Sequence, residues 1–479
     1  MGSQEAKSLA EGAISKAGSA GASYAEARVM ATWERQFALK NGEPQPSFFA
    51  QGYGIGIRVI ADGALGFAAT NDMKRQTVNE IASKAVRLAK ASSAVLKKPV
   101  VLDSSKPAKK RWAAQETKKI ENADASWLRS VLLDVEGRIA DGKAGVKLPG
   151  RILYLGAELE ERFFVNTDGA RVEGRLPRVS FFASLTGMEG GETAQRFIQQ
   201  GETGGLEVVK RIGLADIVEE EARAMGKVLR TATKPPTDTV DVVLSPELSG
   251  IAAHESVGHP QEADRVLGRE GAQAGESYLK SDSLGRKIGS PEANVSDDPT
   301  LLRSNGYVPV DDEGVVASKR LLIKEGVINE FLQNRTTAEE FGLKSNGASR
   351  SVSYNREPII RMSNTFVEPG DYTTEELLKE VRHGVLFKTF TEWNIDDKRL
   401  NQRYVALEAY AIEQGELRGL LKYPVLEITT PKLWGSVKAR SRHMEFEAAT
   451  CGKGDPMQGA PVWTGGPETL LAGIKLGAR

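Results

Sequence analysis

The sequence predicts an α+β protein of two domains, and three observations support this fold class. The chain has 479 residues, more than one domain usually contains. Helical periodicities and antiparallel strand patterns share the N-terminal half, whereas short strands and turns dominate the C-terminal half. Between them, Lys234-Pro235-Pro236-Thr237-Asp238 supports neither a helix nor a central strand, because adjacent prolines lack N–H donors. We therefore expect an N-terminal α/β-type (α+β) domain at 1–233, a linker at 234–239 and a β-rich domain at 240–479.

The first part of the N-terminal domain is expected to combine antiparallel strands with flanking helices. Asn41-Gly42 and Asp62-Gly63 have the composition of hairpin turns. Thr77 and Glu80 have the spacing of a capping box in front of an apolar stripe with helical period. The predicted elements are a helix at 4–16, strands at 24–30, 35–40, 54–60 and 65–69, and a helix beginning near 78.

The second part of this domain repeats the pattern. Residues 97–112 are rich in lysine and proline, which favours an exposed connection. Thr167-Asp168-Gly169 has the composition of another turn. The predicted elements are a helix at 124–140, strands at 151–155, 161–165, 171–173 and 179–185, and an amphipathic helix at 214–230.

The C-terminal domain is expected to be a barrel or a sandwich. Residues 268–306 are polar and without a clear period, so we hypothesise a flap near the functional site. The predicted elements are strands at 240–244, 319–323, 327–332, 359–362, 405–414, 416–421 and 426–430, with helices at 337–341, 374–381 and 466–474.

Composition narrows the class of function. Lys plus Arg and Asp plus Glu both number 64, so the formal net charge is zero, which argues against an electrostatic nucleic-acid binder or a membrane-surface protein. No apolar run approaches the roughly 18 residues of a spanning helix, and no signal-peptide pattern opens the chain. A single cysteine excludes an internal disulfide and fits a reducing compartment. We expect a cytoplasmic protein with neither a nucleic-acid nor a membrane partner.

The segment His254-Glu255-Ser256-Val257-Gly258-His259 holds two of the chain's four histidines. Two imidazoles and a carboxylate so close together could supply two zinc ligands and a general base. The histidines are five residues apart, which on a regular helix separates them by about 140°, so one ion can bind both only if the turn widens or breaks. Ser245-Pro246-Glu247 has the composition of a helix start, so we predict a helix from 246 that is disrupted near Gly258. By itself the motif fits a metal site and an accidental pair of histidines equally well.

A catalytic zinc usually has three protein ligands and one open position. Cys451 is the only cysteine and stands beside a lysine in a glycine-rich turn, so it is a plausible soft ligand, although a lone cysteine is more often a small buried apolar residue. For His383 and His443, which have basic neighbours, we favour surface or structural roles. Glu262 and Asp264 either orient the imidazoles or lie on the surface.

Taken together, several segments resemble the TldD/PmbA family, also called modulator-of-gyrase proteins. They are the His254–His259 motif, Arg361-Met362-Ser363-Asn364-Thr365, Glu368-Pro369-Gly370-Asp371, Cys451-Gly452-Lys453, Asp311-Asp312-Glu313-Gly314, Tyr24-Ala25-Glu26-Ala27-Arg28 and Gly63-Ala64-Leu65-Gly66-Phe67-Ala68. The resemblance covers nearly the whole chain and is closest to the metal-bearing type of subunit.

The resemblance implies a zinc metalloprotease in which His254, His259 and Cys451 bind Zn²⁺ and Glu255 is the catalytic carboxylate. It also implies small or unfolded peptides as substrates, and a homodimer or a heterodimer with a metal-free sister subunit. The alternative is a non-catalytic regulatory protein with a structural metal site. A structural zinc would need a fourth protein ligand, and there is no second cysteine to provide one. A zinc deaminase is disfavoured because the Pro-Cys-x-x-Cys signature is absent.

Overall fold

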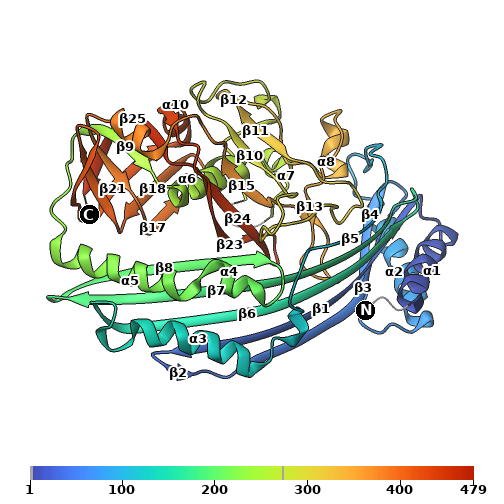
Figure 1. Cartoon of the computed structure of the whole chain (residues 1–479). Coiled ribbons are helices and arrows are strands. Elements are labelled where there is room, and N and C mark those ends of the chain that lie inside the picture. Colours follow the sequence, from blue (N-terminus) through green and yellow to red (C-terminus); the bar gives the residue numbers. More distant parts are fainter. Residues whose placement is uncertain (1–3, 272–274, 479) are drawn as a thin grey trace.

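The computed structural model of the chain describes residues 4–271 and 275–478, and it confirms the α+β class (Figure 1). A long, curved sheet from the N-terminal part lies below the β-rich C-terminal part in this view. The sheet has the order β4-β3-β1-β6-β7-β5, with β2 beside β1 and β8 beside β7; only β5 pairs in parallel. Its strands are β1 (Tyr24–Lys40), β2 (Glu43–Pro44), β3 (Phe48–Ala61), β4 (Ala64–Thr70), β5 (Lys109–Ala113), β6 (Lys147–Asn166), β7 (Arg171–Glu189) and β8 (Glu192–Thr203).

The two faces of this sheet have different environments, as β6 shows. Successive side chains of a strand point to opposite faces. The odd-numbered residues from Leu153 to Val165 belong mainly to apolar clusters with the helices, whereas Tyr154, Glu158 and Arg162 line a cavity next to the C-terminal domain. This polar face is why the sequence predicted two short strands where β6 is continuous, as it also did for β1 and β7.

The helices of the N-terminal part cover the apolar face of the sheet. They are α1 (Gln4–Ser19), α2 (Arg75–Ser93), α3 (Ala125–Ile139), α4 (Glu207–Ile212) and α5 (Leu214–Thr231), with 3-10 turns η1 (Ile120–Asn122) and η2 (Ala140–Gly142). The predicted capping box of α2 is wrong, because Lys74 is the N-cap and the Thr77 hydroxyl donates to Asp72 instead. The predicted exposed connection at 97–112 is also wrong in part, since Asp103 is buried and the segment ends in β5.

Two sheets and the helix between them form the sandwich-like C-terminal part. One sheet has the order β12-β11-β10-β15-β24-β23, and the other β17-β18-β21-β25-β9-β16-β19-β20 with β22 beside β25. The first contains β10 (Val295–Asp297), β11 (Arg320–Lys324), β12 (Val327–Ile328), β15 (Asn364–Val367), β23 (Glu445–Lys453) and β24 (Gln458–Gly466). The second contains β9 (Thr239–Leu244), β16 (His383–Phe387), β17 (Phe390–Ile395), β18 (Asn401–Ala406), β19 (Ala409–Glu413), β20 (Glu416–Leu420), β21 (Pro424–Thr429), β22 (Val437–Arg440) and β25 (Thr469–Ala478).

Helix α6 follows β9 and packs on β15, β23 and β24, so it lies between the two sheets. The remaining elements are α6 (Pro246–Ala253), η3 (His254–Gly258), η4 (His259–Gln261), α7 (Ala263–Val266), η5 (Ser281–Ser283), α8 (Arg335–Glu340), β13 (Ser349–Arg350), β14 (Ile359–Ile360), α9 (Thr374–Lys379) and α10 (Thr430–Gly435). Across residues 4–271 and 275–478, helices that combine the length and the apolar character needed to span a bilayer are absent.

Two predictions for the C-terminal part are wrong. The helix predicted at 466–474 is strand β25, whose apolar side chains enter the core as it pairs with β9 and β21. The hypothesised flap at 268–306 is not an exposed lid in its described part, because Leu279, Ala293 and Val295 are fully buried. Residues 272–274 lie outside the described residues.

Candidate metal centre

Helix α6 begins as its sequence predicts. Ser245 is the N-cap, and its hydroxyl accepts a hydrogen bond from the Leu248 N–H (3.3 Å). Pro246 occupies the first turn, where its missing N–H costs nothing. The chain remains helical as far as Gln261, so His254 and His259 are both part of one continuous helical segment.

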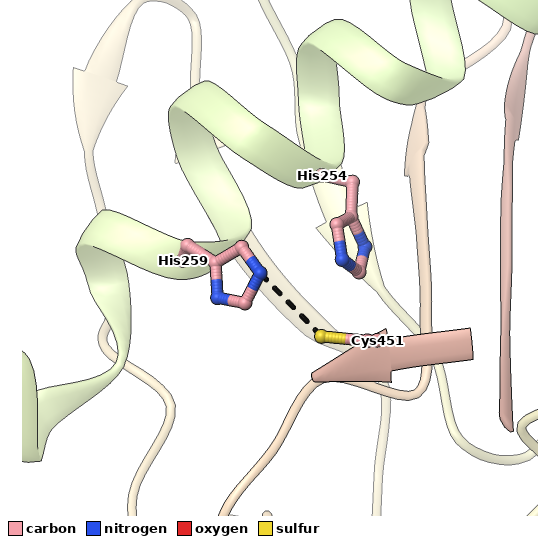
Figure 2. Close-up of side chains that lie close together, drawn as sticks. All are labelled: His254, His259 and Cys451. Carbon is pink, nitrogen blue, oxygen red and sulfur yellow. Dashed lines mark hydrogen bonds between the residues drawn. The ribbon is translucent and has the colours of Figure 1, made fainter. Parts of the chain in front are cut away.

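The predicted disruption of this helix is a π-helical turn over His254–Gly258. The His259 N–H donates to the His254 carbonyl, the i to i+5 bond that widens a turn by one residue. The widened turn brings the two imidazoles to the same side, with ring centroids 5.0 Å apart (Figure 2). The Ser256 hydroxyl braces the turn, donating to the Ala252 carbonyl (2.6 Å) and accepting from Trp434 Nε1 (3.0 Å).

Gly258 is needed in this turn for close packing. Its backbone angles are those of a right-handed helix, so a left-handed conformation does not explain the glycine. A Cβ atom at this position would lie 1.9 Å from Met362 Sδ. The absence of a side chain therefore lets the widened turn pack directly on the segment that follows β14.

Cys451 comes to the two histidines from β23, as the resemblance implies (Figure 2). Its Sγ lies 3.4 Å from His259 Nε2, and one ligand atom from each of His254, His259 and Cys451 lies within 4.8 Å of the others. All three side chains are buried. Two imidazole nitrogens and a thiolate sulfur form a donor set that suits zinc.

The protonation states of the three candidate ligands, and an unpaired nitrogen of His254, also suit a metal site. Burial lowers the pKa of both imidazoles, which favours the neutral form that binds cations. Burial raises the pKa of the Cys451 thiol, but the neighbouring His259 and the positive charge of Arg361 together more than offset this, so the pKa is lowered overall. His254 Nδ1 is buried without a hydrogen-bond partner among the described residues, as expected of an imidazole that binds a ligand.

A carboxylate orients one of the imidazoles. Glu262 Oε2 lies 3.0 Å from His259 Nδ1, so the predicted orienting role of Glu262 has a direct contact behind it. Burial would raise the pKa of Glu262, but Lys453 and Arg265 hold it well below its usual value. Asp264 instead pairs with Lys453 (2.7 Å), two residues after Cys451. Lys453 therefore links the α6–α7 segment to β23.

Glu255 faces the same cavity as the three candidate ligands. Its Oε2 atom lies 2.5 Å from Nη1 of Arg399, which belongs to the turn between β17 and β18. No local pattern in the sequence points to Arg399, because the contact joins residues 144 positions apart. The ion pair fixes the orientation of the Glu255 carboxylate beside His254.

The cavity has a volume of about 330 Å³ and is closed partly by the N-terminal sheet, through Phe197 and Gln199 of β8. A carboxyl pair, Glu247 and Glu447, also lines it. Burial and mutual repulsion raise the pKa of Glu447 well above its usual value. Sequence reasoning missed this pair, because it joins residues 200 positions apart. It also missed β8, although β8 forms a local hairpin with β7 through Gly190 and Gly191.

The other two histidines are apart from this centre, as predicted. His383 is exposed at the start of β16, and His443 is exposed beside Glu445 and Glu468. In the described part of the chain, His254, His259 and Cys451 are the one group whose geometry suits a metal ion.

Comparisons with known proteins agree with this geometry. Family models described as PmbA/TldA metallopeptidase domain 1, central domain and C-terminal domain match residues 25–89, 115–227 and 237–478. A metalloprotease of Methanocaldococcus jannaschii is 30% identical over 447 residues, covering 92% of this chain and 94% of its own. A metalloprotease TldD homolog of Haemophilus influenzae is 25% identical over 460 residues, covering 95% of this chain and 92% of its own.

Solved structures show the same fold. TldE from Thermococcus kodakarensis has a TM-score of 0.73 at 19% identity, with 98% of this chain and 100% of that chain covered. A putative modulator of a DNA gyrase from Thermotoga maritima has a TM-score of 0.76 at 17% identity, with the same coverage. Since the C-terminal family model alone spans half of the chain and the archaeal relative matches nearly all of it, the protein belongs to the PmbA/TldD metallopeptidase family.

Proposed function

We propose that this protein is a zinc-dependent metallopeptidase that hydrolyses small or unfolded peptides with Glu255 as general base. The observation that carries the proposal is the convergence of His254, His259 and Cys451, within 4.8 Å of one another, at the wall of a cavity. Zinc bound by these residues would make hydroxide available near neutral pH and polarise the scissile carbonyl.

The roles of the chain's own residues follow from their positions. Glu255 adjoins a metal ligand in sequence and faces the cavity, so it is placed to take a proton from water and return it to the leaving amine. Arg399 is a positioning residue that holds the Glu255 carboxylate in one orientation. Glu262 fixes the ring of His259 through Nδ1 and leaves Nε2 for the metal.

The small number of ligands supports a catalytic site over a structural one. A structural zinc is normally closed by a fourth protein ligand, whereas the cluster found among the described residues has three. All three side chains line the cavity of about 330 Å³. There is thus room for water and for the reacting part of a peptide.

An extended peptide fits the surroundings of the site. Strand β23, which carries Cys451, is the last strand of its sheet, so its outer edge has backbone groups to offer. A peptide that pairs with this edge would pass the metal through main-chain hydrogen bonds, with little dependence on sequence. The enclosure between β8 and β23 favours small or unfolded chains over folded proteins.

We also propose a cytoplasmic protein that forms a dimer, either with itself or with a metal-free sister subunit. The single buried cysteine, free of any disulfide, is compatible with a reducing compartment. The dimer rests on the family resemblance. Analytical ultracentrifugation of the purified chain tests it, since a monomer at micromolar concentration would contradict the homodimer.

The proposal is tested with Glu255→Ala, measuring zinc by mass spectrometry and hydrolysis with a mixture of unstructured peptides. Zinc should persist, because Glu255 is not a ligand, while hydrolysis falls by about 10²-fold or more. Glu445→Ala is a matched control, since this glutamate is exposed on the same strand as Cys451. Hydrolysis that survives Glu255→Ala would contradict the mechanism. A zinc-loaded wild-type protein without peptidase activity would favour a structural metal instead.

A further inference from the structure

A second cavity adjoins the one lined by His254, His259 and Cys451, which we call the metal cavity. It has a volume of about 600 Å³ and lies between the polar face of the N-terminal sheet and strands β23 and β24. The two cavities share parts of their walls: Gln199 of β8, and Ala448, Ala449 and Thr450 of β23. A peptide bound along β23 would therefore have access to both.

Three arginines line this second cavity, and two of them have carboxylate partners. Arg162 lies 3.0 Å from Asp312, and Arg178 lies 3.0 Å from Glu158. Arg350 differs. Its guanidinium donates to two carbonyl groups, Met362 O (2.7 Å) and Pro461 O (3.0 Å), and it forms no ion pair with a carboxylate anywhere in residues 4–271 and 275–478.

The charge of Arg350 is thus poorly compensated although its side chain is about nine-tenths buried. Burial and the nearby positive charges of Arg361, Arg178 and Arg162 lower its pKa to about 9. The carboxylates of the same cavity are engaged elsewhere: Glu158 and Glu160 pair with Arg178 and Arg162, and Glu34 bonds Gln36. A buried cation without a counter-charge is costly, and an anionic ligand would relieve that cost.

The position of Arg350 suits a group attached to a bound peptide. Pro461, which accepts its hydrogen bond, is paired in register with Thr450, and Thr450 precedes the candidate ligand Cys451. With strands about 4.8 Å apart, the guanidinium lies on the order of 10 Å from the thiol. An extended peptide covers that distance in about three residues.

We propose that Arg350 forms a subsite for a carboxylate of the peptide substrate, most directly the C-terminal carboxylate of a short peptide. The inference rests on the proposed peptidase function and specifies its substrate class. A guanidinium can bind a carboxylate through two parallel hydrogen bonds, so the subsite would favour peptides that end within about three residues of the cleaved bond.

The test compares two peptides that differ only at the C-terminus, one a free acid and the other an amide, with neutral side chains throughout. The wild-type protein should cleave the acid with a kcat/KM about tenfold or more above that of the amide, chiefly through KM. A third peptide, an amide with one glutamate in the C-terminal part, distinguishes a side-chain carboxylate from the terminal one. Equal kcat/KM for all three peptides would overturn the inference.

Variants then assign the preference to Arg350. In Arg350→Gln the acid-to-amide ratio should fall toward one, and Arg350→Lys, which keeps the charge, should restore part of it. Arg403→Gln on β18 is the control and should keep the wild-type ratio, because Arg403 lies outside this cavity. If Arg350→Gln slows both peptides by the same factor, Arg350 only braces the two carbonyls and the inference is wrong.

A binding measurement keeps this inference separate from the proposed function. Calorimetry with the Glu255→Gln protein compares trialanine with trialanine amide, and the acid should bind about tenfold more tightly. If no peptide is cleaved but the acid binds preferentially, the peptidase proposal fails and the carboxylate subsite stands. If peptides are cleaved and both ligands bind alike, the reverse holds.

Discussion

The N-terminal sheet and the C-terminal metal domain contribute to the site in different ways. The long sheet supplies a wall, with Phe197 and Gln199 facing the metal cavity, but all three candidate ligands come from α6–η4 and β23. Long, regular strands form a stable surface, whereas an irregular helix positions two of the candidate metal ligands, His254 and His259. The candidate ligands thus lie in the C-terminal part alone, whereas the proposed peptide path is enclosed by both parts, so effects on metal binding and on peptide binding should be separable by mutation.

The largest effect should follow from Cys451→Ala in the C-terminal part. Removing the thiolate leaves two imidazoles, so most of the bound zinc and nearly all hydrolysis should disappear together. Zinc per chain and peptide turnover are measured on the same preparation. A variant that retained full zinc occupancy would show that the three side chains do not form the metal site.

A smaller loss is expected when only the support of a ligand is removed. Glu262→Gln keeps the shape of the side chain but weakens its bond to His259 Nδ1, so zinc affinity should fall by about 10- to 100-fold. Competition with a chelator measures this affinity. The exposed Glu339→Gln in α8 is the control and should leave the affinity as it is.

A substitution in the N-terminal sheet tests the contribution of that sheet to the cavity. Phe197→Ala enlarges the cavity without touching a ligand, so zinc content should stay at the wild-type level while KM for peptides rises several-fold. Steady-state kinetics and metal analysis together test this. Loss of zinc in Phe197→Ala would mean that the two parts are not separable.

The smallest effect concerns the stability of the N-terminal part at low pH. Burial raises the pKa of Glu207, but N–H groups of Gly205, Lys118 and Thr117 donate to its carboxylate and lower the pKa to about 2. A depressed pKa means that the carboxylate stabilises the fold above its unfolded pKa of about 4.5 and loses this contribution as pH falls toward 2. Glu207→Gln should therefore flatten the decline of thermal stability below pH 4.5, and zinc content at neutral pH should not change.

Local signals carried most of what the sequence could reveal about the site. Ser245 and Pro246 marked the start of α6, and the five-residue spacing of the histidines demanded the widened turn that the structure contains. Cys451 was placed by family resemblance. Arg399 could not be predicted, because its contact with Glu255 joins residues 144 positions apart. Arg350 could only be guessed at as a substrate contact, because its place beside β24 depends on Pro461, 111 positions away.

The difference between local signals and long-range contacts also explains the errors in the predicted fold. A hydrophobic pattern indicates which face of a strand packs against apolar neighbours. Because β6 has one polar face toward a cavity, its sequence predicted two short strands in place of one long strand. The prediction of a capping box at Thr77 was wrong because the Thr77 hydroxyl donates its hydrogen bond to Asp72. The strand β25 was mistaken for a helix because its pairing with β9, β21 and β22 is a tertiary contact that the local pattern of 466–474 does not report.

The gap of 192 residues between His259 and Cys451 has a consequence for the life of the protein. During synthesis the helix with both imidazoles emerges long before the thiol does, and N-terminal parts of a chain tend to fold first. A ribosome-bound intermediate would thus hold an incomplete set of donors and would bind the proposed zinc weakly. On the proposed function, the chain would become able to cut peptides only after Cys451 has left the ribosome and joined the two histidines.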